Sequence, residues 1–273
     1  MTKTALITGA SSGIGKAAAQ LFAGKGWNVV ATMRKPEAET ELADGANMLV
    51  TRLDVQDKAS IAAGIGAALD RFGAIDVLVN NAGFSLFGLF EATSAAKVEE
   101  QFAVNVFGVL DTIRAALPHI RKQCGAIVNV TSAGGIFTLP LMSLYHATKF
   151  SIEGFTESLA FELASQQVAM KLVEPGAVRT NFEHRMFAEF QQDSALDCYD
   201  DYVNGVVAIY QGMLAGEVSQ ADDVAKVIFD AANDRSERLR YIVGNDIAPL
   251  VEMRRTAGED NYIHFMRSQF APK

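Results

Sequence analysis

The chain has 273 residues, of which 49% are hydrophobic and 21% are charged. This composition is typical of a soluble globular protein and excludes disordered and coiled-coil classes. The formal net charge of −8 argues against a nucleic-acid partner, and the two cysteines and four scattered histidines form neither a disulfide framework nor a zinc motif. No apolar run approaches the ~18 residues of a membrane span, and no signal-peptide pattern is visible, so we expect a cytoplasmic protein without a metal.

Short apolar runs rich in β-branched residues alternate with longer helical patterns along most of the chain. The expected strands lie at 5–8, 28–32, 48–53, 77–80, 126–130, 171–174 and 241–243. The expected helices lie at 14–22, 60–72, 96–121, 144–162 and 221–233. Several strands are apolar at consecutive positions, as is typical of parallel strands covered on both faces. The pattern predicts a single α/β domain of the Rossmann type, doubly wound, with a seven-stranded parallel sheet and helices on both faces.

Two segments interrupt the alternation of strands and helices. The segment at about 181–218 contains aromatic, methionine and acidic residues and no strand pattern. Because insertions near the carboxyl ends of strands shape ligand sites in such sheets, we expect it to be a substrate loop. The tail from about residue 245 is expected to be irregular. No linker or internal repeat is present, so residues 1–273 are predicted to form one catalytic, dinucleotide-binding domain.

A glycine-rich turn follows the first expected strand and opens the first expected helix. It contains Gly9, Gly13 and Gly15, spaced G-x-x-x-G-x-G rather than as the common G-x-G-x-x-G fingerprint. The first glycine allows a tight turn, and the other two allow the backbone to approach a pyrophosphate and the helix to pack on the sheet. The free N–H groups at the helix start then face the phosphates. An ordinary strand-to-helix turn is the alternative, which the position after the first strand makes less favourable.

The end of the second expected strand indicates which cofactor is used. An acidic residue that would bind a ribose 2′-hydroxyl is usually found here, but Met33 occupies its place and Arg34 and Lys35 follow. Glu37 comes after a proline, beyond the reach of the strand. A guanidinium at this position favours a 2′-phosphate, so the sequence predicts NADP(H) over NAD(H). A solvated basic turn is the alternative.

Polar motifs after successive strands resemble the short-chain dehydrogenase/reductase family over about residues 3–180. The matching segments are 8–15, 53–55, 80–83, Asn105, Ser132, 145–149 and 175–180. The resemblance implies a nicotinamide cofactor and a single set of residues that bind it. The implied cofactor-binding residues are Gly9, Ser11, Ser12, Gly13, Ile14, Gly15, Arg34, Asp54, Val55, Asn81, Ala82, Gly83, Tyr145, Lys149, Pro175, Gly176, Val178 and Thr180.

Tyr145 and Lys149 are four residues apart on an expected helix, so both side chains lie on one helix face. A phenol with a pKa of about 10 is a poor base at neutral pH. A nearby ammonium favours the phenolate and moves Tyr145 toward general acid–base catalysis. Ser132, at the end of a strand, can hydrogen-bond the substrate oxygen. Taken singly, Ser132 could be a turn residue and Tyr145 a buried aromatic.

The resemblance adds two roles to this set of catalytic residues. It implies that Lys149 also binds the hydroxyls of the nicotinamide ribose. It further implies that Asn105 is a fourth catalytic residue, which holds a water between Lys149 and solvent. Asparagine is unfavourable inside a helical run such as 101–109, which supports a functional reason for it.

The expected substrate walls at 84–87, 133–143 and 182–210 are rich in phenylalanine, leucine and methionine. Such a pocket suits a hydrophobic ketone or aldehyde and its alcohol, as in carbonyl reductases and steroid or retinol dehydrogenases. Two alternatives stay open on the same fold, a non-catalytic NADP-binding sensor and an epimerase. The resemblance also implies a homodimer or homotetramer, assembled through the helices expected at 96–121 and 144–162.

Overall fold

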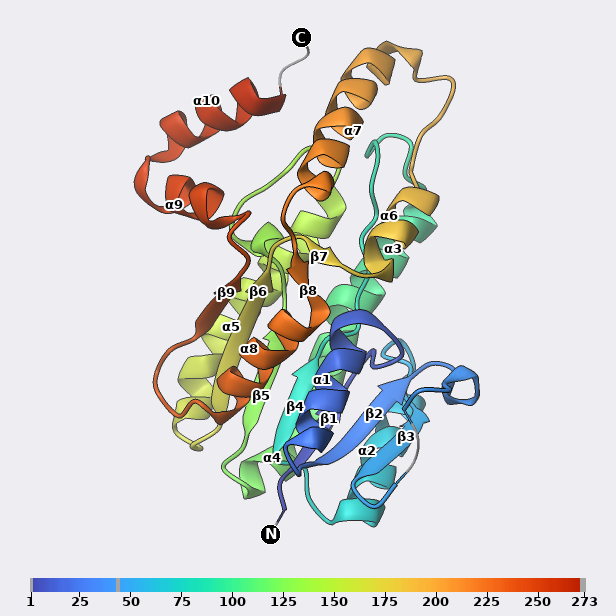
Figure 1. The fold of residues 1–273 in the computed structure, drawn as a ribbon, viewed down its shortest axis with the longest axis vertical. Coiled ribbons are helices and arrows are strands. Elements are labelled where there is room, and N and C mark those ends of the chain that lie inside the picture. Colours follow the sequence, from blue (N-terminus) through green and yellow to red (C-terminus); the bar gives the residue numbers. More distant parts are fainter. Residues whose placement is uncertain (1, 43–44, 271–273) are drawn as a thin grey trace.

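A seven-stranded parallel sheet forms the centre of the molecule in a computed structural model, which describes residues 2–42 and 45–270 (Figure 1). Its strand order is β3-β2-β1-β4-β5-β6-β9, and each neighbouring pair is parallel. The strands are β1 (Thr4–Ile7), β2 (Asn28–Met33), β3 (Met48–Arg52), β4 (Val77–Asn80), β5 (Ala126–Val130), β6 (Ala169–Pro175) and β9 (Arg240–Val243). The predicted seven-stranded parallel sheet is confirmed.

Helices cover both faces of the sheet, as the doubly wound prediction requires. On one face lie α1 (Gly13–Gly24) and α8 (Ala221–Asn233), and on the other lie α2 (Lys58–Phe72), α4 (Gly108–Lys122) and α5 (Ser143–Ala164). Successive strand residues point to opposite faces, so Ala5 and Ile7 pack with α1 while Leu6 packs with α2. Within residues 2–42 and 45–270, no helix is long and apolar enough to cross a lipid bilayer.

The strand order reverses at β1, whose neighbours β2 and β4 lie on its two sides. The chain leaves β1 toward one edge of the sheet and later returns to build the other half. In open α/β sheets, ligands bind in the crevice that this reversal opens at the carboxyl ends of the strands. The glycine turn after β1 and the loop after β4 meet at this point.

The helix expected at 96–121 is interrupted in the structure. It consists of α3 (Ala95–Phe102), a π-helical turn at Ala103–Phe107 and α4. A π-turn inserts an extra residue into the helical ladder and is frequent at functional sites. Here it contains Asn105, the residue whose place in a helix was unfavourable by propensity.

The segment at 181–218 forms helices above the carboxyl edge of the sheet. It contains α6 (Asn181–Ala188), a short 3₁₀ turn at Asp197–Tyr199 and α7 (Asp200–Ala215). Two further strands, β7 (Val178–Arg179) and β8 (Ser219–Gln220), pair in parallel at its two ends. This small sheet was not predicted, because strands of two residues leave no periodic pattern. It closes the insertion at its base.

The tail after Gly244 is helical, which corrects the expectation of an irregular tail. It forms α9 (Ala248–Thr256) and α10 (Glu259–Phe270), and α10 contacts α7. Tyr262 and Met266, one helical turn apart, pack with Phe137 in a separate apolar cluster, and the Tyr262 hydroxyl accepts a hydrogen bond from the Thr138 N–H at 3.2 Å. The many charged residues of these short helices hide this narrow apolar stripe in the sequence.

We expect Met266→Ala to lower the free energy of unfolding by about 2 kcal/mol, because it removes a buried side chain and leaves a cavity. Urea denaturation measures this change. The matched control is Gln269→Ala on the exposed side of the same helix, which should leave stability unchanged. Equal stability of both variants and the unmodified protein would show that α10 is not docked.

Candidate active site

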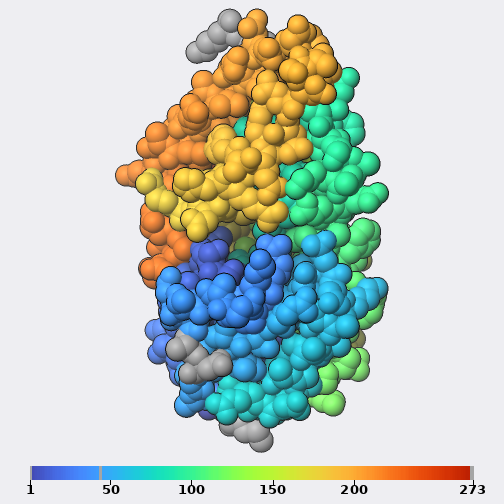
Figure 2. Space-filling view, turned by 90° about the vertical axis from the view of Figure 1, so that its right-hand side faces the viewer, coloured from blue at the N-terminus to red at the C-terminus, as the bar shows by residue number. Residues whose placement is uncertain are grey.

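A cavity of about 570 Å³ opens at the carboxyl ends of the strands. Figure 2 shows the corresponding hollow between the blue N-terminal part of the chain and the yellow and orange insertion. The loops after β1 to β6, together with α6, supply its walls. Among the residues predicted for the site, only Gly15 and Asn105 are absent from these walls. Those that line it are Gly9, Ser11, Ser12, Gly13, Ile14, Arg34, Asp54, Val55, Asn81, Ala82, Gly83, Ser132, Tyr145, Lys149, Pro175, Gly176, Val178 and Thr180.

The glycine turn after β1 has no room for side chains. Gly9 has a φ of +67°, and a Cβ atom there would lie 2.9 Å from the Ala82 Cα atom. A Cβ atom at Gly15 would lie 2.3 Å from the Gly9 carbonyl oxygen, so Gly15 serves the packing of α1 against the turn rather than the cavity. The absence of side chains lets a ligand reach the backbone.

Hydrogen bonds tie this turn to the loop after β4. The Asn81 side-chain amide donates to the carbonyl oxygens of Thr8 and Gly9 at 3.0 and 3.1 Å. The Thr8 hydroxyl accepts in return from the backbone N–H groups of Asn81 and Ala82 at 3.0 and 3.1 Å. Thr8 was not predicted as a site residue, although its position directly before the first glycine is a usable signal.

The amino terminus of α1 points its backbone N–H groups toward the cavity. Ser12 caps this helix with extended backbone, but its hydroxyl makes no hydrogen bond to the helix. The first N–H groups of a helix lack partners within the helix and carry a partial positive charge. Together with the bare glycine turn, they fit the phosphate groups of a dinucleotide.

Arg34 lies at the edge of the cavity, directly after the buried Met33 at the end of β2. Its guanidinium is exposed and makes no hydrogen bond or ion pair with another residue in the described part of the chain. The nearby acid Glu39 is engaged elsewhere, since its carboxylate accepts from Lys16 at 3.1 Å and from the backbone N–H groups of residues 40–42. An anionic group of a ligand bound at this edge of the cavity can therefore pair with Arg34.

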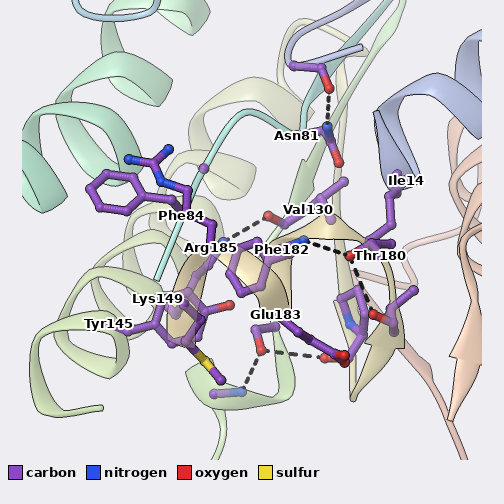
Figure 3. Close-up of a pocket in the computed structure, with 18 of the residues that line it drawn as sticks. Ile14, Asn81, Phe84, Val130, Tyr145, Lys149, Thr180, Phe182, Glu183 and Arg185 are labelled. Carbon is purple, nitrogen blue, oxygen red and sulfur yellow. Dashed lines mark hydrogen bonds between the residues drawn. The ribbon is translucent and has the colours of Figure 1, made fainter. Parts of the chain in front are cut away.

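Ser132, Tyr145 and Lys149 all line this cavity. Figure 3 shows Tyr145 and Lys149 side by side on α5. The Ser132 hydroxyl accepts from the Gly134 N–H at 3.0 Å, which fixes it at the end of β5. The Lys149 ammonium donates to the Val130 carbonyl oxygen at 3.2 Å and lies 5.5 Å from the centre of the Tyr145 ring. The spacing in the sequence thus produces the expected juxtaposition.

Burial dominates the electrostatics of these groups. It raises the pKa of Tyr145 to about 12, and hydrogen bonding with Ser132 opposes the rise. It lowers the pKa of Lys149 to about 8, opposed by the negative charge of Glu153. The expected lowering of the Tyr145 pKa by Lys149 is thus not present in the protein alone. Burial removes the water that would stabilise the Tyr145 phenolate, and this loss outweighs the stabilisation by the hydrogen bond with Ser132. The Lys149 ammonium lies over the Tyr145 ring.

Asn105 is buried and does not line the cavity, and its expected catalytic role stays a prediction. Its side chain donates to the Phe84 carbonyl oxygen at 2.8 Å and to the Thr148 hydroxyl at 3.2 Å, and accepts from the Phe84 N–H at 3.1 Å. The π-turn directs the Asn105 side chain toward the loop after β4, so its amide forms hydrogen bonds with protein groups. Asn105 therefore holds this loop against α5.

His146 is a residue of the site that sequence reasoning missed. Its buried ring lies under the loop that follows Ser132, with Nδ1 2.8 Å from the Gly134 carbonyl oxygen and Nε2 accepting from the Leu139 N–H at 2.8 Å. Both bonds require a neutral ring with its proton on Nδ1. Burial lowers the pKa of His146, in agreement with this state. The available signal in the sequence was the position of this polar residue, directly after Tyr145 in the expected helix.

The turn that follows β6 is held by a residue from the tail. The Asp246 carboxylate accepts from the Ala177 N–H at 3.0 Å and lines the cavity beside Gly176. This contact was not predicted, because the tail was expected to be irregular. Among the residues described, no group of three or more His, Cys, Asp or Glu side chains is arranged to hold a metal ion.

The upper half of the cavity is largely apolar. Arg185 of α6 covers the Phe84 ring, with its guanidinium carbon 4.2 Å from the ring centre (Figure 3). Of the expected wall residues, Phe87 and Phe187 pack against each other outside the cavity instead. The apolar residues that line this half are Phe84, Phe137, Leu139, Met142, Phe182, Met186, Tyr210, Met213, Leu214 and Ile247.

Comparison with known proteins agrees with this geometry. A family model described as short chain dehydrogenase matches residues 3–191. An oxidoreductase of Schizosaccharomyces pombe is 36% identical, covering 87% of this chain and 99% of the relative. Estradiol 17-beta-dehydrogenase 1 of Rattus norvegicus is 34% identical, covering 91% of this chain and 76% of the relative. The structure of a short-chain dehydrogenase/reductase from Burkholderia phymatum in complex with NAD is similar, with a TM-score of 0.80 and 28% identity, covering 100% of this chain and 96% of that one.

We expect His146→Phe to lower the free energy of unfolding at pH 7.5 by about 2 kcal/mol, because the Leu139 N–H and Gly134 carbonyl lose their partner. The pKa of His146 is below its ordinary 6.5 in the folded protein, so the unfolded chain binds more protons and stability falls as the pH drops below about 6.5. The variant should lose that part of the acid sensitivity.

Urea unfolding between pH 5 and 8 measures both effects. The control is His264→Gln on the exposed side of α10, which should keep the acid sensitivity of the unmodified protein. Identical pH dependence in all three proteins would contradict the role assigned to His146.

Proposed function

The chain belongs to the short-chain dehydrogenase family, and we propose that it is an NADP(H)-dependent oxidoreductase that interconverts a hydrophobic ketone or aldehyde and its alcohol. The observation that carries the proposal is the meeting of Ser132, Tyr145 and Lys149 in one cavity. One end of this cavity is lined by glycine backbone and a helix amino terminus, and the other by apolar side chains. A dinucleotide and an apolar substrate suit these two ends.

The residues that hold the cofactor follow from the shape of the site. The turn at Gly9 and Gly13 and the start of α1 receive the diphosphate, and Arg34 receives the 2′-phosphate of the adenosine ribose. Lys149 holds the nicotinamide ribose. A bound nicotinamide supplies a hydride for reduction or accepts one for oxidation. The relative from Burkholderia phymatum, solved with NAD, supports a nicotinamide cofactor, whereas the preference for NADP(H) rests on Arg34.

Tyr145 donates a proton to the substrate oxygen during reduction and takes it back during oxidation. Its raised pKa keeps the hydroxyl protonated at neutral pH, which suits the donor. The Lys149 ammonium stabilises the phenolate left behind, since the group is largely charged at pH 7 with a pKa of about 8. The Ser132 hydroxyl orients the substrate oxygen toward Tyr145.

The substrate is a hydrophobic carbonyl compound or alcohol. Phenylalanine, leucine and methionine side chains from α6, α7 and the loops after β4 and β5 line that half of the cavity. Flexible methionines adapt to an apolar ligand of irregular shape. The rat relative is named for estradiol, an apolar polycyclic alcohol, which supports this substrate class.

We further propose a cytoplasmic homodimer or homotetramer that binds no nucleic acid. Phe107, the last residue of the π-helical turn before α4, and Phe150 and Phe161 of α5 are large apolar side chains left exposed. Exposed aromatics on neighbouring helices support an interface between copies of the chain. Cys124 and Cys198 are both free and exposed, which fits a reducing compartment.

Tyr145→Phe should lower kcat at least about 100-fold while cofactor affinity stays nearly unchanged, because only the proton-donating hydroxyl is lost. Initial rates against a panel of ketones and alcohols, followed by nicotinamide absorbance, test the first part. A titration of nicotinamide fluorescence tests the second. Tyr199→Phe, outside the cavity, is the control and should keep full activity. A Tyr145→Phe enzyme with more than a tenth of the normal rate would contradict the acid–base role.

The double variant Met33→Asp, Arg34→Ala should shift the ratio of kcat/KM for NADPH and NADH toward NADH, mainly through KM for NADPH. An aspartate repels the 2′-phosphate, and the loss of an exposed cation accounts for about tenfold. Removal of a comparable exposed cation outside the cavity, in Arg114→Ala, should leave the ratio unchanged. The preference is refuted if the unmodified enzyme uses NADH as efficiently as NADPH.

A further inference from the structure

Two buried carboxyl groups lie directly behind the catalytic residues. Glu153 follows Lys149 by one turn of α5, so the two side chains share a helix face. Its carboxylate accepts a hydrogen bond from the Thr131 hydroxyl at 2.7 Å, and Thr131 immediately precedes Ser132. Glu174, on β6, immediately precedes the turn at Pro175 that lines the cavity and has no exposed side-chain surface. Neither glutamate lines the cavity itself.

A single arginine side chain contacts both glutamates. The Arg240 guanidinium on β9 lies 3.0 Å from the Glu153 carboxylate and 3.6 Å from that of Glu174, and it also bonds Glu157 on α5. One guanidinium thus faces three carboxyl groups. The remaining charged groups that influence the pair are Lys149 on α5 and Arg255 on α9.

Glu174 has no ordinary hydrogen-bond donor. No N–H or hydroxyl group in the described part of the chain donates to either of its buried oxygens. Both carboxyl groups lie against the same atom, the Arg240 Nε, which is 3.0 Å from Glu153 and 3.6 Å from Glu174. Two buried carboxylates held this close together repel strongly unless one of them is protonated, and a protonated carboxyl can donate a hydrogen bond to the other. Burial and the charge of Glu153 raise the pKa of Glu174 to about 8, in agreement with one retained proton.

We propose that Glu153 and Glu174 share one proton and act as a positioning pair that sets the charge of Lys149. Glu153 receives hydrogen bonds from a hydroxyl and a guanidinium, whereas Glu174 receives neither. The proton therefore stays on Glu174, and the negative charge stays on Glu153, one helical turn from the ammonium. This charge offsets the burial of Lys149 and keeps it cationic. The effect on catalysis rests on the function proposed above for Lys149.

The shared proton can be observed without any substrate. Infrared spectra of the unmodified protein at pH 7 should contain the band of a protonated carboxyl group, which disappears as the pH is raised above about 8. Glu174→Gln should remove this band. Glu183→Gln is the matched control, because Glu183 also has a raised pKa but lies on α6, away from the pair. Absence of a band that depends on Glu174 would overturn the proposal, whether or not the enzyme turns over any substrate.

The influence on Lys149 appears in the pH profile of kcat. Activity falls at high pH as the ammonium loses its proton. Glu153→Gln removes the stabilising charge and should move this fall to lower pH by about one pH unit. Glu174→Gln can still donate a hydrogen bond to Glu153 and should leave the fall near its normal pH. If the two glutamates had a purely structural role, both variants would lose activity, and the pH at which kcat falls would not differ between them.

A milder substitution keeps the test valid if the glutamate variants fail to fold. Thr131→Val removes the hydroxyl that stabilises charge on Glu153 and leaves both carboxyl groups in place. Part of the proton then moves to Glu153, so the high-pH fall in kcat should move in the same direction as in Glu153→Gln, by a smaller amount. No movement in Thr131→Val, or equal movement in the two glutamate variants, would overturn the proposed coupling to Lys149.

Discussion

The hydrogen bonds between the Asn81 side chain and the glycine turn hold the two halves of the cavity together. The sheet reverses direction at β1, so the turn after β1 and the loop after β4 belong to separate halves of the fold. Asn81 and Thr8 join them by reciprocal bonds at the reversal. This contact joins the glycine turn to the loop after β4, and Asn105 joins that loop to α5. Helix α5, which carries Tyr145 and Lys149, is thereby placed relative to the glycine turn.

Burial has opposite consequences for the two titrating groups of the site. It disfavours the charged form of each, so the Tyr145 phenol keeps its proton and the Lys149 amine tends to lose one. In the reaction proposed above, the ammonium offsets the cost of forming a phenolate in a buried site. The negative charge of Glu153, one helical turn along α5, opposes the loss of the Lys149 proton. In this proposal, the charge of Lys149 depends on Glu153, which does not line the cavity.

The features that the sequence predicted are those determined locally. The strands, the turn at Gly9 and the spacing of Tyr145 and Lys149 leave periodic or positional patterns, and the structure places them within one or two residues of expectation. Several of the features that were missed depend on distant partners. Tyr262 packs on Phe137 across the molecule, and Asp246 bonds a turn in another part of the chain. Such contacts leave no periodic signal in either of their two segments.

The helical tail has a consequence for the order in which the site is completed. Ser132, Tyr145 and Lys149 all precede the insertion, whereas Asp246 and Ile247, which line the cavity, come after the last strand. During synthesis from the amino terminus, the catalytic groups therefore exist before one wall of their cavity does. The cavity of a nascent chain therefore lacks this wall until β9 has joined the edge of the sheet.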